Sequence, residues 1–276
     1  MQGDSLVTRR EGPVRRFLGP PGSPLRRRLR ALPLLGVVLG LVVRVYRSVR
    51  DAKLDLQLRL QRAQTDFRNR RAKTAANITR RNNRRAYERV YRDDRLTGEY
   101  LDPARLAFYE EVAGIVAPLC SGKAVVDIGC GAGNLLQDVV KRAAPARVVG
   151  VDYAVAGVER ARRAVPGGEF HSCSLYELDL QETFDVVLCT EVLEHLSKPE
   201  AAMRILVRLC ADDGVIVITV PDGEHDSWTG HRNFWSEPEL VRFLGRHGEV
   251  EVSRLHSDPT SLLARLRPGA GRPDAG

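Results

Sequence analysis

The sequence predicts an α/β domain: a doubly wound, mostly parallel sheet with helices on both faces, preceded by a basic helical N-terminal extension. Two observations predict this arrangement. From residue 123 onward, short β-branched runs alternate with helical stretches, which is typical of a parallel sheet covered on both faces. The charge also divides the chain, because residues 1–100 hold 25 basic and 9 acidic residues, whereas residues 101–276 hold 18 and 26. A strongly basic extension therefore precedes a mildly acidic domain.

The boundaries of the expected elements follow from the spacing of apolar residues and from the turn residues between them. Strands are expected at 123–128, 147–151, 169–173, 184–189, 215–220 and 250–255. Helices are expected near 133–143, 154–164, 198–210 and 237–247. The last two helices begin with capping-box sequences, in which a serine and a glutamate three residues later satisfy backbone groups of the first turn, at Ser197–Glu200 and Ser236–Glu239.

Three segments precede the domain. The tail at 1–30 is rich in Arg, Gly and Pro and holds too little apolar surface to order itself. The apolar segment at 31–46 is shorter than the roughly 20 residues that span a bilayer, so we expect it to lie on an anionic membrane surface; a local hydrophobic patch and a marginal span are the alternatives. Apolar residues at helical spacing predict a basic amphipathic helix at 47–84, which is a solvated strut, a self-association helix or a membrane-surface helix.

The end of the chain and its cysteines complete the outline of the domain, which is expected to cover 85–256. A flexible tail is expected at 257–276, since it is rich in Pro, Gly and Arg, and residues 261–267 form a further strand only weakly. The five cysteines are odd in number and include no C-x-x-C pair, which disfavours a disulfide framework or a zinc ribbon. Buried thiols in a reducing compartment predict a cytoplasmic protein, peripheral at the membrane if the apolar segment binds there.

The strongest motif is a glycine turn at the end of the first expected strand. Asp127 lies in that strand, and Gly129, Gly131 and Gly133 follow it before a helix begins. Glycines let the turn tighten and let a ligand approach the backbone, while the helix N-terminus offers free N–H groups. A dinucleotide fold needs a glycine at the position of Asn134, so this turn indicates a different nucleotide ligand, with the acidic side chain facing a cationic end. Asp152, at the end of the second strand, is placed to accept hydrogen bonds from ribose hydroxyls.

With these residues and the run Phe184-Asp-Val-Val-Leu-Cys-Thr-Glu-Val-Leu-Glu-His-Leu196, the chain resembles the class I S-adenosylmethionine-dependent methyltransferases, especially the small-molecule group that includes ubiquinone and menaquinone biosynthesis enzymes. The resemblance implies a Rossmann-like fold with S-adenosylmethionine as cofactor. It places the methionine end at Asp127 and the turn 129–133, and the ribose at Asp152. Family members often have an aspartate near the adenine where this chain has a serine. The resemblance implies further cofactor contacts at Cys130, Tyr153, Ser174, Leu175 and Glu191.

Two histidines are candidates for a base that assists a hydroxyl acceptor. His195 follows the fourth strand, and a structural role in fixing its loop is the alternative. His231 lies in an aromatic and polar loop after the fifth strand, where it either contacts the substrate or faces water. The segment Glu224–Asp226, together with His231, lacks a fixed ligand spacing, so no metal site is predicted. Aromatic residues on the helices before the sheet either cover the cofactor or, as we favour, pack against the sheet: Tyr87, Tyr91, Tyr100 and Phe108.

The sequence therefore predicts a methyltransferase that acts on a small-molecule or lipid-linked acceptor, at oxygen, by in-line displacement. Positioning of the acceptor and exclusion of water supply most of the rate in such a reaction. An RNA methyltransferase that holds phosphates with residues 1–100 is one alternative, although few aromatic residues interleave with the basic ones. A non-catalytic scaffold tethered to a membrane is the other, and the intact acidic and glycine positions argue against it.

Overall fold

The computed structural model describes residues 82–226, 228, 230–257 and 260–269 of this protein. The predicted tail at 1–30, the apolar segment at 31–46 and nearly all of the predicted helix at 47–84 lie outside the described residues, so they stay predictions. Within the described ranges, no helix is both long and apolar enough to cross a membrane.

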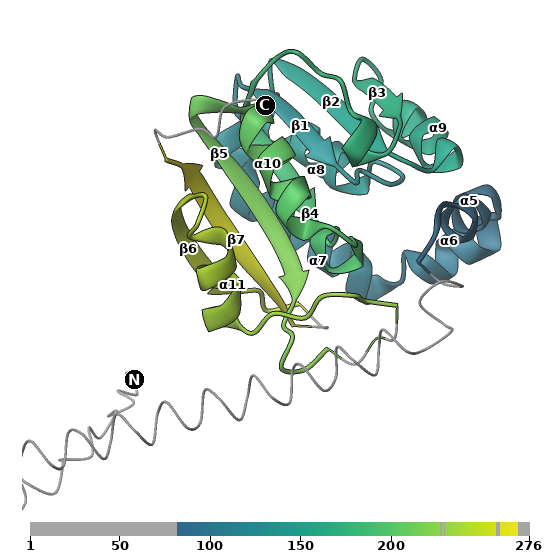
Figure 1. Ribbon diagram of the computed structural model, residues 1–276. Coiled ribbons are helices and arrows are strands. Elements are labelled where there is room, and N and C mark those ends of the chain that lie inside the picture. Colours follow the sequence, from purple (N-terminus) through teal and green to yellow (C-terminus); the bar gives the residue numbers. More distant parts are fainter. Residues whose placement is uncertain (1–81, 227, 229, 258–259, 270–276) are drawn as a thin grey trace, which may run out of the picture. The chain divides into compact units, whose positions relative to one another are not determined.

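The core of the protein is a seven-stranded sheet with the order β3-β2-β1-β4-β5-β7-β6 (Figure 1). The strands β1 to β5 pair in parallel, and β7 is antiparallel to both of its neighbours, β5 and β6. The predicted doubly wound, mostly parallel sheet is confirmed. The strands are β1 Ala124–Ile128, β2 Arg147–Asp152, β3 Glu169–Ser172, β4 Phe184–Thr190, β5 Cys210–Pro221, β6 Gly248–Arg254 and β7 Ser261–Pro268.

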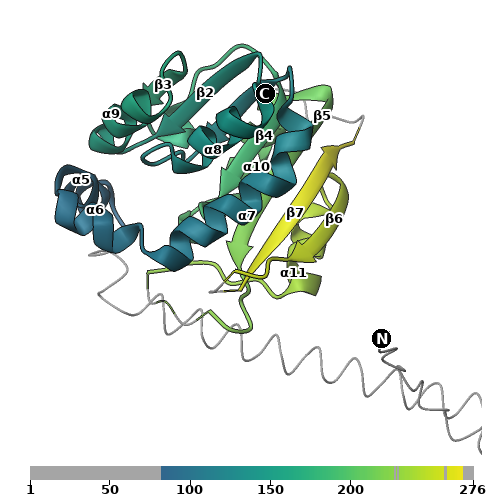
Figure 2. The same ribbon diagram turned by 180° about the vertical axis from the view of Figure 1, so that it is seen from behind.

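Helices cover both faces of the sheet, because successive residues of each buried strand point to opposite sides. One apolar cluster joins Val125 and Val186 of the strands to α7, α8 and α9, and the other joins Val126 and Val187 to α10 and α11. Figures 1 and 2 accordingly show α10 on one face of the sheet and α7 on the opposite face. These helices are α7 Pro103–Cys120, α8 Asn134–Ala143, α9 Val155–Ala164, α10 Pro199–Leu209 and α11 Glu237–Leu244.

The predicted flexible tail at 257–276 is wrong over Ser261–Pro268, which form β7 in the interior of the sheet. The domain therefore extends beyond its predicted end at residue 256. This strand has no Val, Ile or aromatic residue, so its intrinsic preference for strand structure is low. Its side chains are nevertheless largely buried, and its backbone pairs with a strand on each side. Tertiary pairing thus overrides the local preference.

One of the two predicted capping boxes forms. At the start of α11, the Ser236 side chain caps the first turn and Glu239 accepts a hydrogen bond from the Ser236 backbone N–H at 2.9 Å. The box predicted at Ser197–Glu200 is wrong, because α10 begins one residue later than that box requires. Its N-cap is Lys198, which makes no side-chain capping bond.

Two short helices, α5 Arg84–Arg92 and α6 Asp94–Tyr100, precede α7. The side chains of Asn83 and Asp93 cap their first turns. The Glu88 carboxylate of α5 accepts hydrogen bonds from the backbone N–H groups of Val155 and Ala156, at 2.7 and 3.1 Å, and so caps the start of α9. This contact fixes α5 beside the carboxyl ends of β1 and β2, where a doubly wound sheet binds its ligands.

Candidate functional site

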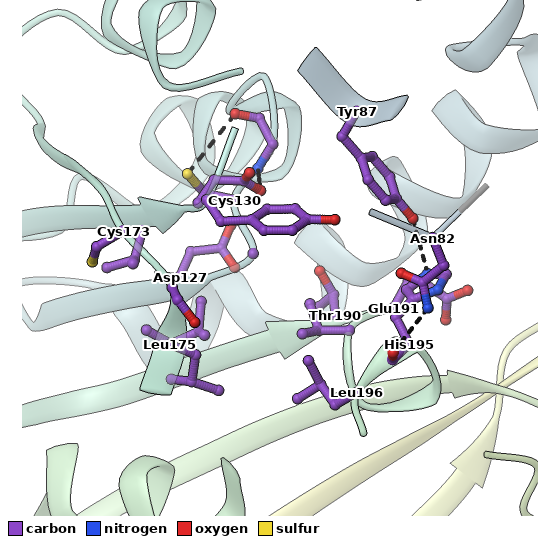
Figure 3. Close-up of a pocket in the computed structure, with 18 of the residues that line it drawn as sticks. Asn82, Tyr87, Asp127, Cys130, Cys173, Leu175, Thr190, Glu191, His195 and Leu196 are labelled. Carbon is purple, nitrogen blue, oxygen red and sulfur yellow. Dashed lines mark hydrogen bonds between the residues drawn. The ribbon is translucent and has the colours of Figure 1, made fainter. Parts of the chain in front are cut away.

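A cavity of about 280 Å³ lies at the carboxyl ends of β1, β2 and β4. Its floor is made by the turns that follow these strands, and its cover by side chains from the helices before the sheet (Figure 3). Almost all of the predicted site residues line it: Asp127, Gly129, Cys130, Gly131, Asp152, Tyr153, Ser174, Leu175, Glu191 and His195.

The glycine turn forms one wall of the cavity. Gly129 and Gly131 have φ angles of +84° and +52°, in the left-handed region that favours glycine. A Cβ atom at Gly129 would lie 2.3 Å from Val192 Cγ2, and one at Gly131 would lie 2.6 Å from the Tyr91 hydroxyl oxygen. Only glycine therefore lets the loop after β4 and the cover helix α5 close on this turn.

Gly133, predicted to bind the cofactor, is not among the residues that line the cavity. It is the N-cap of α8 with φ +80°, and a Cβ there would lie 3.0 Å from both Cα and Cβ of Ala161 in α9. The missing side chain thus lets two helices pack closely together. This role, rather than ligand contact, accounts for the third glycine of the turn.

Asp127 places a buried carboxylate at the end of β1. The residue is 1% exposed, and its Oδ1 atom has no hydrogen-bond partner within the described ranges. Burial, with a smaller contribution from the neighbouring Asp152 carboxylate, raises the pKa of Asp127 to about 7. A buried carboxylate without a partner is unfavourable unless a cation or donor pairs with it. The site is therefore suited to a ligand with a positively charged end.

Asp152 joins β2 to the glycine turn. One of its carboxylate oxygens accepts a hydrogen bond from the Gly131 N–H at 3.0 Å, and the other accepts one from the Ala154 N–H at 2.8 Å. Burial raises the pKa of Asp152, and these two hydrogen bonds counter part of that shift. Because a carboxylate oxygen can accept two hydrogen bonds, each of these oxygens can still accept one from a hydroxyl group of a ligand.

The wall of the cavity that is formed by the residues after β3 is less polar than the wall at Asp127 and Asp152. Ser174 caps the short helix η1 Leu175–Glu177, where its hydroxyl oxygen accepts a hydrogen bond from the Tyr176 N–H at 3.3 Å. Leu175 is buried beside it, and Cys173 also faces the cavity. A flat aromatic base fits between such side chains better than a charged group does.

Glu191 follows β4 in a left-handed conformation, with φ +55°. Its Oε1 atom accepts a hydrogen bond from the Thr219 hydroxyl at 3.1 Å, and its Oε2 atom lies 3.8 Å from a guanidinium nitrogen of Arg105. Burial raises the pKa of Glu191, and the Arg105 charge opposes that shift. The carboxylate is therefore held by α7 and β5, so its predicted contact with the cofactor stays a prediction.

Tyrosines from the helices before the sheet line the cavity, although we favoured packing against the sheet for them. The hydroxyl-bearing rings of Tyr87, Tyr91 and Tyr100 face the turn at the ends of β1 and β2, whereas Phe108 packs in the core as predicted. Tyr109 of α7 also lines the cavity, although nothing in the sequence pattern singles it out. Tyrosines on one face of a helix can either pack against the sheet or line a ligand site, and only the position of the helix over the sheet decides between these roles.

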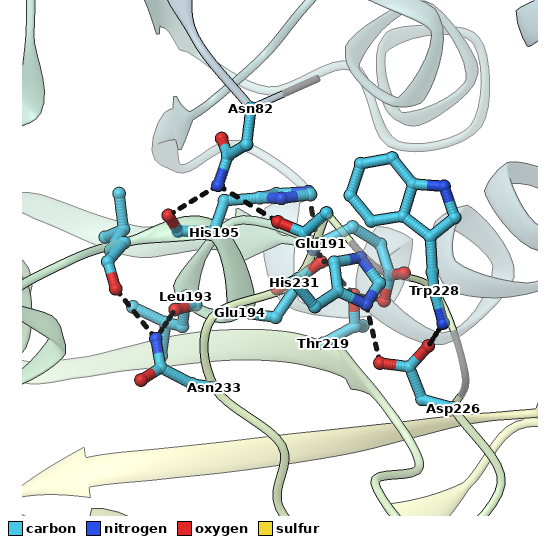
Figure 4. Close-up of polar contacts among 12 residues, drawn as sticks. Asn82, Glu191, Leu193, Glu194, His195, Thr219, Asp226, Trp228, His231 and Asn233 are labelled. Carbon is cyan, nitrogen blue, oxygen red and sulfur yellow. Dashed lines mark hydrogen bonds and ion pairs between the residues drawn. The ribbon is translucent and has the colours of Figure 1, made fainter. Parts of the chain in front are cut away.

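The two candidate bases occupy different positions. His195 lines the cavity, and its Nε2 atom lies 3.4 Å from the Tyr87 hydroxyl. Burial, with smaller contributions from His231 and Arg105, lowers the pKa of His195 to about 3, so its ring is neutral at ordinary pH. His231 does not line the cavity. It lies behind His195, with 4.8 Å between the ring centroids, and its Nδ1 atom is 2.6 Å from an Asp226 carboxylate oxygen (Figure 4).

A family model for the methyltransferase domain, Methyltransf_23, matches residues 98–248, more than half of the chain. The chain belongs to this methyltransferase family. A ubiquinone biosynthesis O-methyltransferase from Neisseria meningitidis serogroup A is 35% identical over 177 residues, which are 54% of this chain and 70% of that protein. A trans-aconitate 2-methyltransferase from Methylobacterium nodulans is 30% identical over 128 residues, 46% of this chain and 50% of that protein.

Solved structures share the fold of this methyltransferase. A DhpI–SAH complex has a TM-score of 0.56 and 20% identity, covering 72% of this chain and all of the DhpI chain. The N-methyltransferase NodS from Bradyrhizobium japonicum WM9, in complex with S-adenosyl-L-homocysteine, has a TM-score of 0.55 and 20% identity, covering 68% of this chain and 98% of NodS. Together with the family match, these structures make the chain a class I S-adenosylmethionine-dependent methyltransferase.

The cavity of this methyltransferase fits the cofactor S-adenosylmethionine at each of its parts. The unpaired Asp127 oxygen suits the ammonium group of the methionine end, and Gly129 and Gly131 let the ligand approach the backbone. Asp152 has lone pairs left for the ribose hydroxyls, and Leu175 offers an apolar contact to the adenine. The cofactor supplies a methyl group made electrophilic by its sulfonium sulfur.

Proposed function

We propose that this methyltransferase transfers the methyl group to a hydroxyl oxygen of a small organic acceptor. The observation that carries the proposal is the polar corner of the cavity, where the Tyr87 hydroxyl and the neutral ring of His195 face each other at 3.4 Å. The rest of the cover is aromatic. Such a corner orients a hydroxyl group by hydrogen bonds while the aromatic side chains exclude water, and orientation with dehydration is most of what methyl transfer requires.

The size of the cavity supports a small acceptor. The cavity of about 280 Å³ is just below the range of about 300–1,000 Å³ that is typical of ligand pockets, and the cofactor takes up most of it. The part of the acceptor that enters beside the methyl group is therefore compact. A lipid-linked acceptor remains within the proposal if only its head group enters. The relatives that act in ubiquinone biosynthesis and on trans-aconitate support a small-molecule acceptor and favour oxygen as the methylated atom.

His195 orients the acceptor by a hydrogen bond and does not remove the proton from the acceptor hydroxyl. Because burial lowers the pKa of His195 to about 3, the ring accepts a hydrogen bond from a hydroxyl but is a weak base. His231 acts on the reaction through His195, since it packs against that ring and does not line the cavity. We therefore assign His231 a positioning role, in place of the direct contact that the sequence suggested.

Product mass spectrometry tests the proposal. The purified full chain is incubated with isotopically labelled S-adenosylmethionine and with two fractions of a cell extract, one of small molecules and lipids and one of RNA. We expect a product in the first fraction whose mass rises by one methyl group in place of a hydrogen, with the label on oxygen. A product labelled on nitrogen, or label in the RNA fraction alone, would contradict the proposal.

A further inference from the structure

At the wall of the cavity, three side chains that can bind a metal ion lie close together: Glu194, His195 and His231. The Glu194 carboxylate is 1% exposed, and neither of its oxygens has a hydrogen-bond partner in the part of the chain that the structure describes. Its Oε1 atom lies 3.6 Å from His195 Nε2 and 4.0 Å from His231 Nε2. One ligand atom from each residue lies within 4.8 Å of the other two. Figure 4 shows Glu194 between the two histidines.

An unpartnered buried carboxylate needs an explanation, because removing it from water without a partner is strongly unfavourable. The nearby Arg105 guanidinium lies 3.8 Å from Glu191 instead, and among the described residues Glu194 forms ion pairs with the two histidines alone. Two neutral imidazoles and a carboxylate are a common ligand set for first-row divalent cations. Ligand atoms about 2.1 Å from one ion lie about 3–4 Å apart, close to the separations seen here.

The hydrogen bond to Asp226 leaves the other ring nitrogen of His231 available to bind an ion. Its Nδ1 atom lies 2.6 Å from Asp226 Oδ2, so the ring N–H donates to that carboxylate and the lone pair on Nε2 faces Glu194. A carboxylate that orients a histidine in this way is the usual outer partner of a metal-binding histidine. The backbone supports the arrangement, because the carbonyl oxygen of Glu194 accepts hydrogen bonds from the N–H groups of Arg232 and Asn233, at 2.7 and 3.1 Å. The loop that carries His231 is thereby fastened over Glu194.

We propose that Glu194, His195 and His231 bind one divalent cation of the first transition row, with Asp226 as the outer partner of His231. Of the three ligands only His195 lines the cavity, so the ion lies at the cavity wall, and its open positions are directed to the acceptor side. The use of the ion in catalysis rests on the proposed function with one change: His195 Nε2 binds the ion, and the acceptor hydroxyl coordinates the ion instead of donating to that nitrogen. A coordinated hydroxyl loses its proton to water more readily, and its oxygen then bonds the methyl carbon as the carbon–sulfur bond breaks.

A second group of metal-type side chains serves as the control. Asp222, Glu224 and His225 lie together at the start of the same loop. Asp222 is already paired with Arg254, and the His225 side chain is 71% exposed. This group therefore has no buried ligand atom that lacks a partner, and it carries no proposal.

The test measures ion binding directly. The full chain, stripped with a chelator, is titrated calorimetrically with Zn²⁺, Mn²⁺ and Mg²⁺ in separate experiments, and bound metal is counted by elemental mass spectrometry. We expect one equivalent of Zn²⁺ or Mn²⁺ per chain, bound at least tenfold more weakly by Glu194→Gln and by His231→Gln. Asp226→Asn is expected to weaken binding about 10–100-fold. His225→Gln, the matched control, is expected to bind as the unaltered chain does.

Affinity for S-adenosylhomocysteine in the absence of metal shows that each variant is folded, since Glu194 and His231 do not line the cavity. We expect that affinity to stay within about twofold of the unaltered chain. The proposal is overturned if the unaltered chain binds none of the three ions, or if Glu194→Gln binds them as well as His225→Gln does. The first result, with nucleoside binding retained, points to a shared proton between Glu194 and His231 and leaves the proposed function standing.

Discussion

Asp127 is the residue whose charge depends most directly on the cofactor. Its carboxylate is buried at the end of β1, where burial and the neighbouring Asp152 raise its pKa to about 7. A bound ammonium group stabilises the ionised form and lowers the pKa again. Binding of such a ligand therefore releases a proton whenever Asp127 is protonated beforehand.

The affinity of the protein for S-adenosylhomocysteine is thus expected to depend on pH. Above pH 7 the Asp127 carboxylate is already ionised and the affinity is constant, whereas below pH 7 deprotonation opposes binding. We expect the dissociation constant to be about tenfold higher at pH 6 than at pH 8, as measured by calorimetry. In Asp127→Asn the binding should be weaker at every pH but flat across this range. A flat profile in the unaltered chain contradicts the prediction.

Residues that end a strand could be predicted from the sequence, because the order of parallel strands places their carboxyl ends at one edge. Asp127, Asp152 and His195 accordingly line the cavity. The direction in which a neighbouring residue points could not be predicted. Gly133 faces α9 and His231 lies behind another ring, and both orientations are set by tertiary packing. Glu194 was part of the recognised motif, but only its burial beside two histidines indicates a role.

At the scale of secondary-structure elements, close packing between α8 and α9 depends on Gly133. Its φ of +80° is unfavourable for an L-residue, and an added Cβ would lie 3.0 Å from Ala161. We expect Gly133→Ala to lower the free energy of unfolding by about 1–3 kcal/mol. The matched control is Gly114→Ala, in the exposed middle of α7 with no atom near the new methyl group, which should stabilise by about 0.5–1 kcal/mol. Urea unfolding measures both, and equal effects would contradict the prediction.

The connection between β6 and β7 is fastened to α7 by Glu111. Its carboxylate accepts hydrogen bonds from the backbone N–H groups of His256 and Ser257, both at 2.8 Å. Although burial opposes the shift, these bonds lower the pKa of Glu111 to about 2. Since the folded-state pKa lies below the unfolded value, the stabilisation is present above about pH 4.5 and is lost as the pH falls toward 2.

Glu111→Gln is therefore expected to destabilise the protein by about 1–2 kcal/mol at pH 7, because hydrogen bonds to a charged acceptor become bonds to a neutral one. Thermal unfolding of the variant and of the unaltered chain should converge as the pH is lowered from 4.5 to 2. Glu110→Gln is the control, since Glu110 is exposed and its ion pair with Arg142 is at the surface. A pH-independent difference for Glu111→Gln would show that the loss is one of packing.

The extent to which elements could be predicted follows from how strongly each depends on local sequence. Strands β1, β2, β4 and β5 are rich in β-branched residues between turns, and the short β3 contains none but lies between turns. All five were predicted to within a few residues, apart from an early start of β5 at Cys210. β7 has no such residues and forms because β5 and β6 pair with its two edges. Its position depends on partners distant in the sequence, and a local pattern does not report them.

At the scale of the whole chain, charge is the property that the methyltransferase fold does not account for. Residues 1–81 hold 20 basic and 5 acidic residues, and they include the apolar segment at 31–46. Basic residues close to an anionic membrane each contribute about 1 kcal/mol to binding, and the interaction is screened by salt. A basic extension binds RNA phosphates by the same physics. The two partners differ in whether apolar residues add to the binding.

We therefore expect the full chain to bind vesicles that contain an anionic phospholipid, and part of that binding to persist at 0.5 M salt, because burial of apolar side chains is not screened. Co-sedimentation with anionic and with neutral vesicles measures this, and a chain that begins at residue 82 is expected to bind neither. Replacing Leu34, Leu35 and Val37 by serine keeps every charge and should remove only the salt-resistant part. If instead the chain binds RNA tightly and binds neither kind of vesicle, the basic extension is a nucleic-acid-binding segment, and RNA becomes the candidate methyl acceptor.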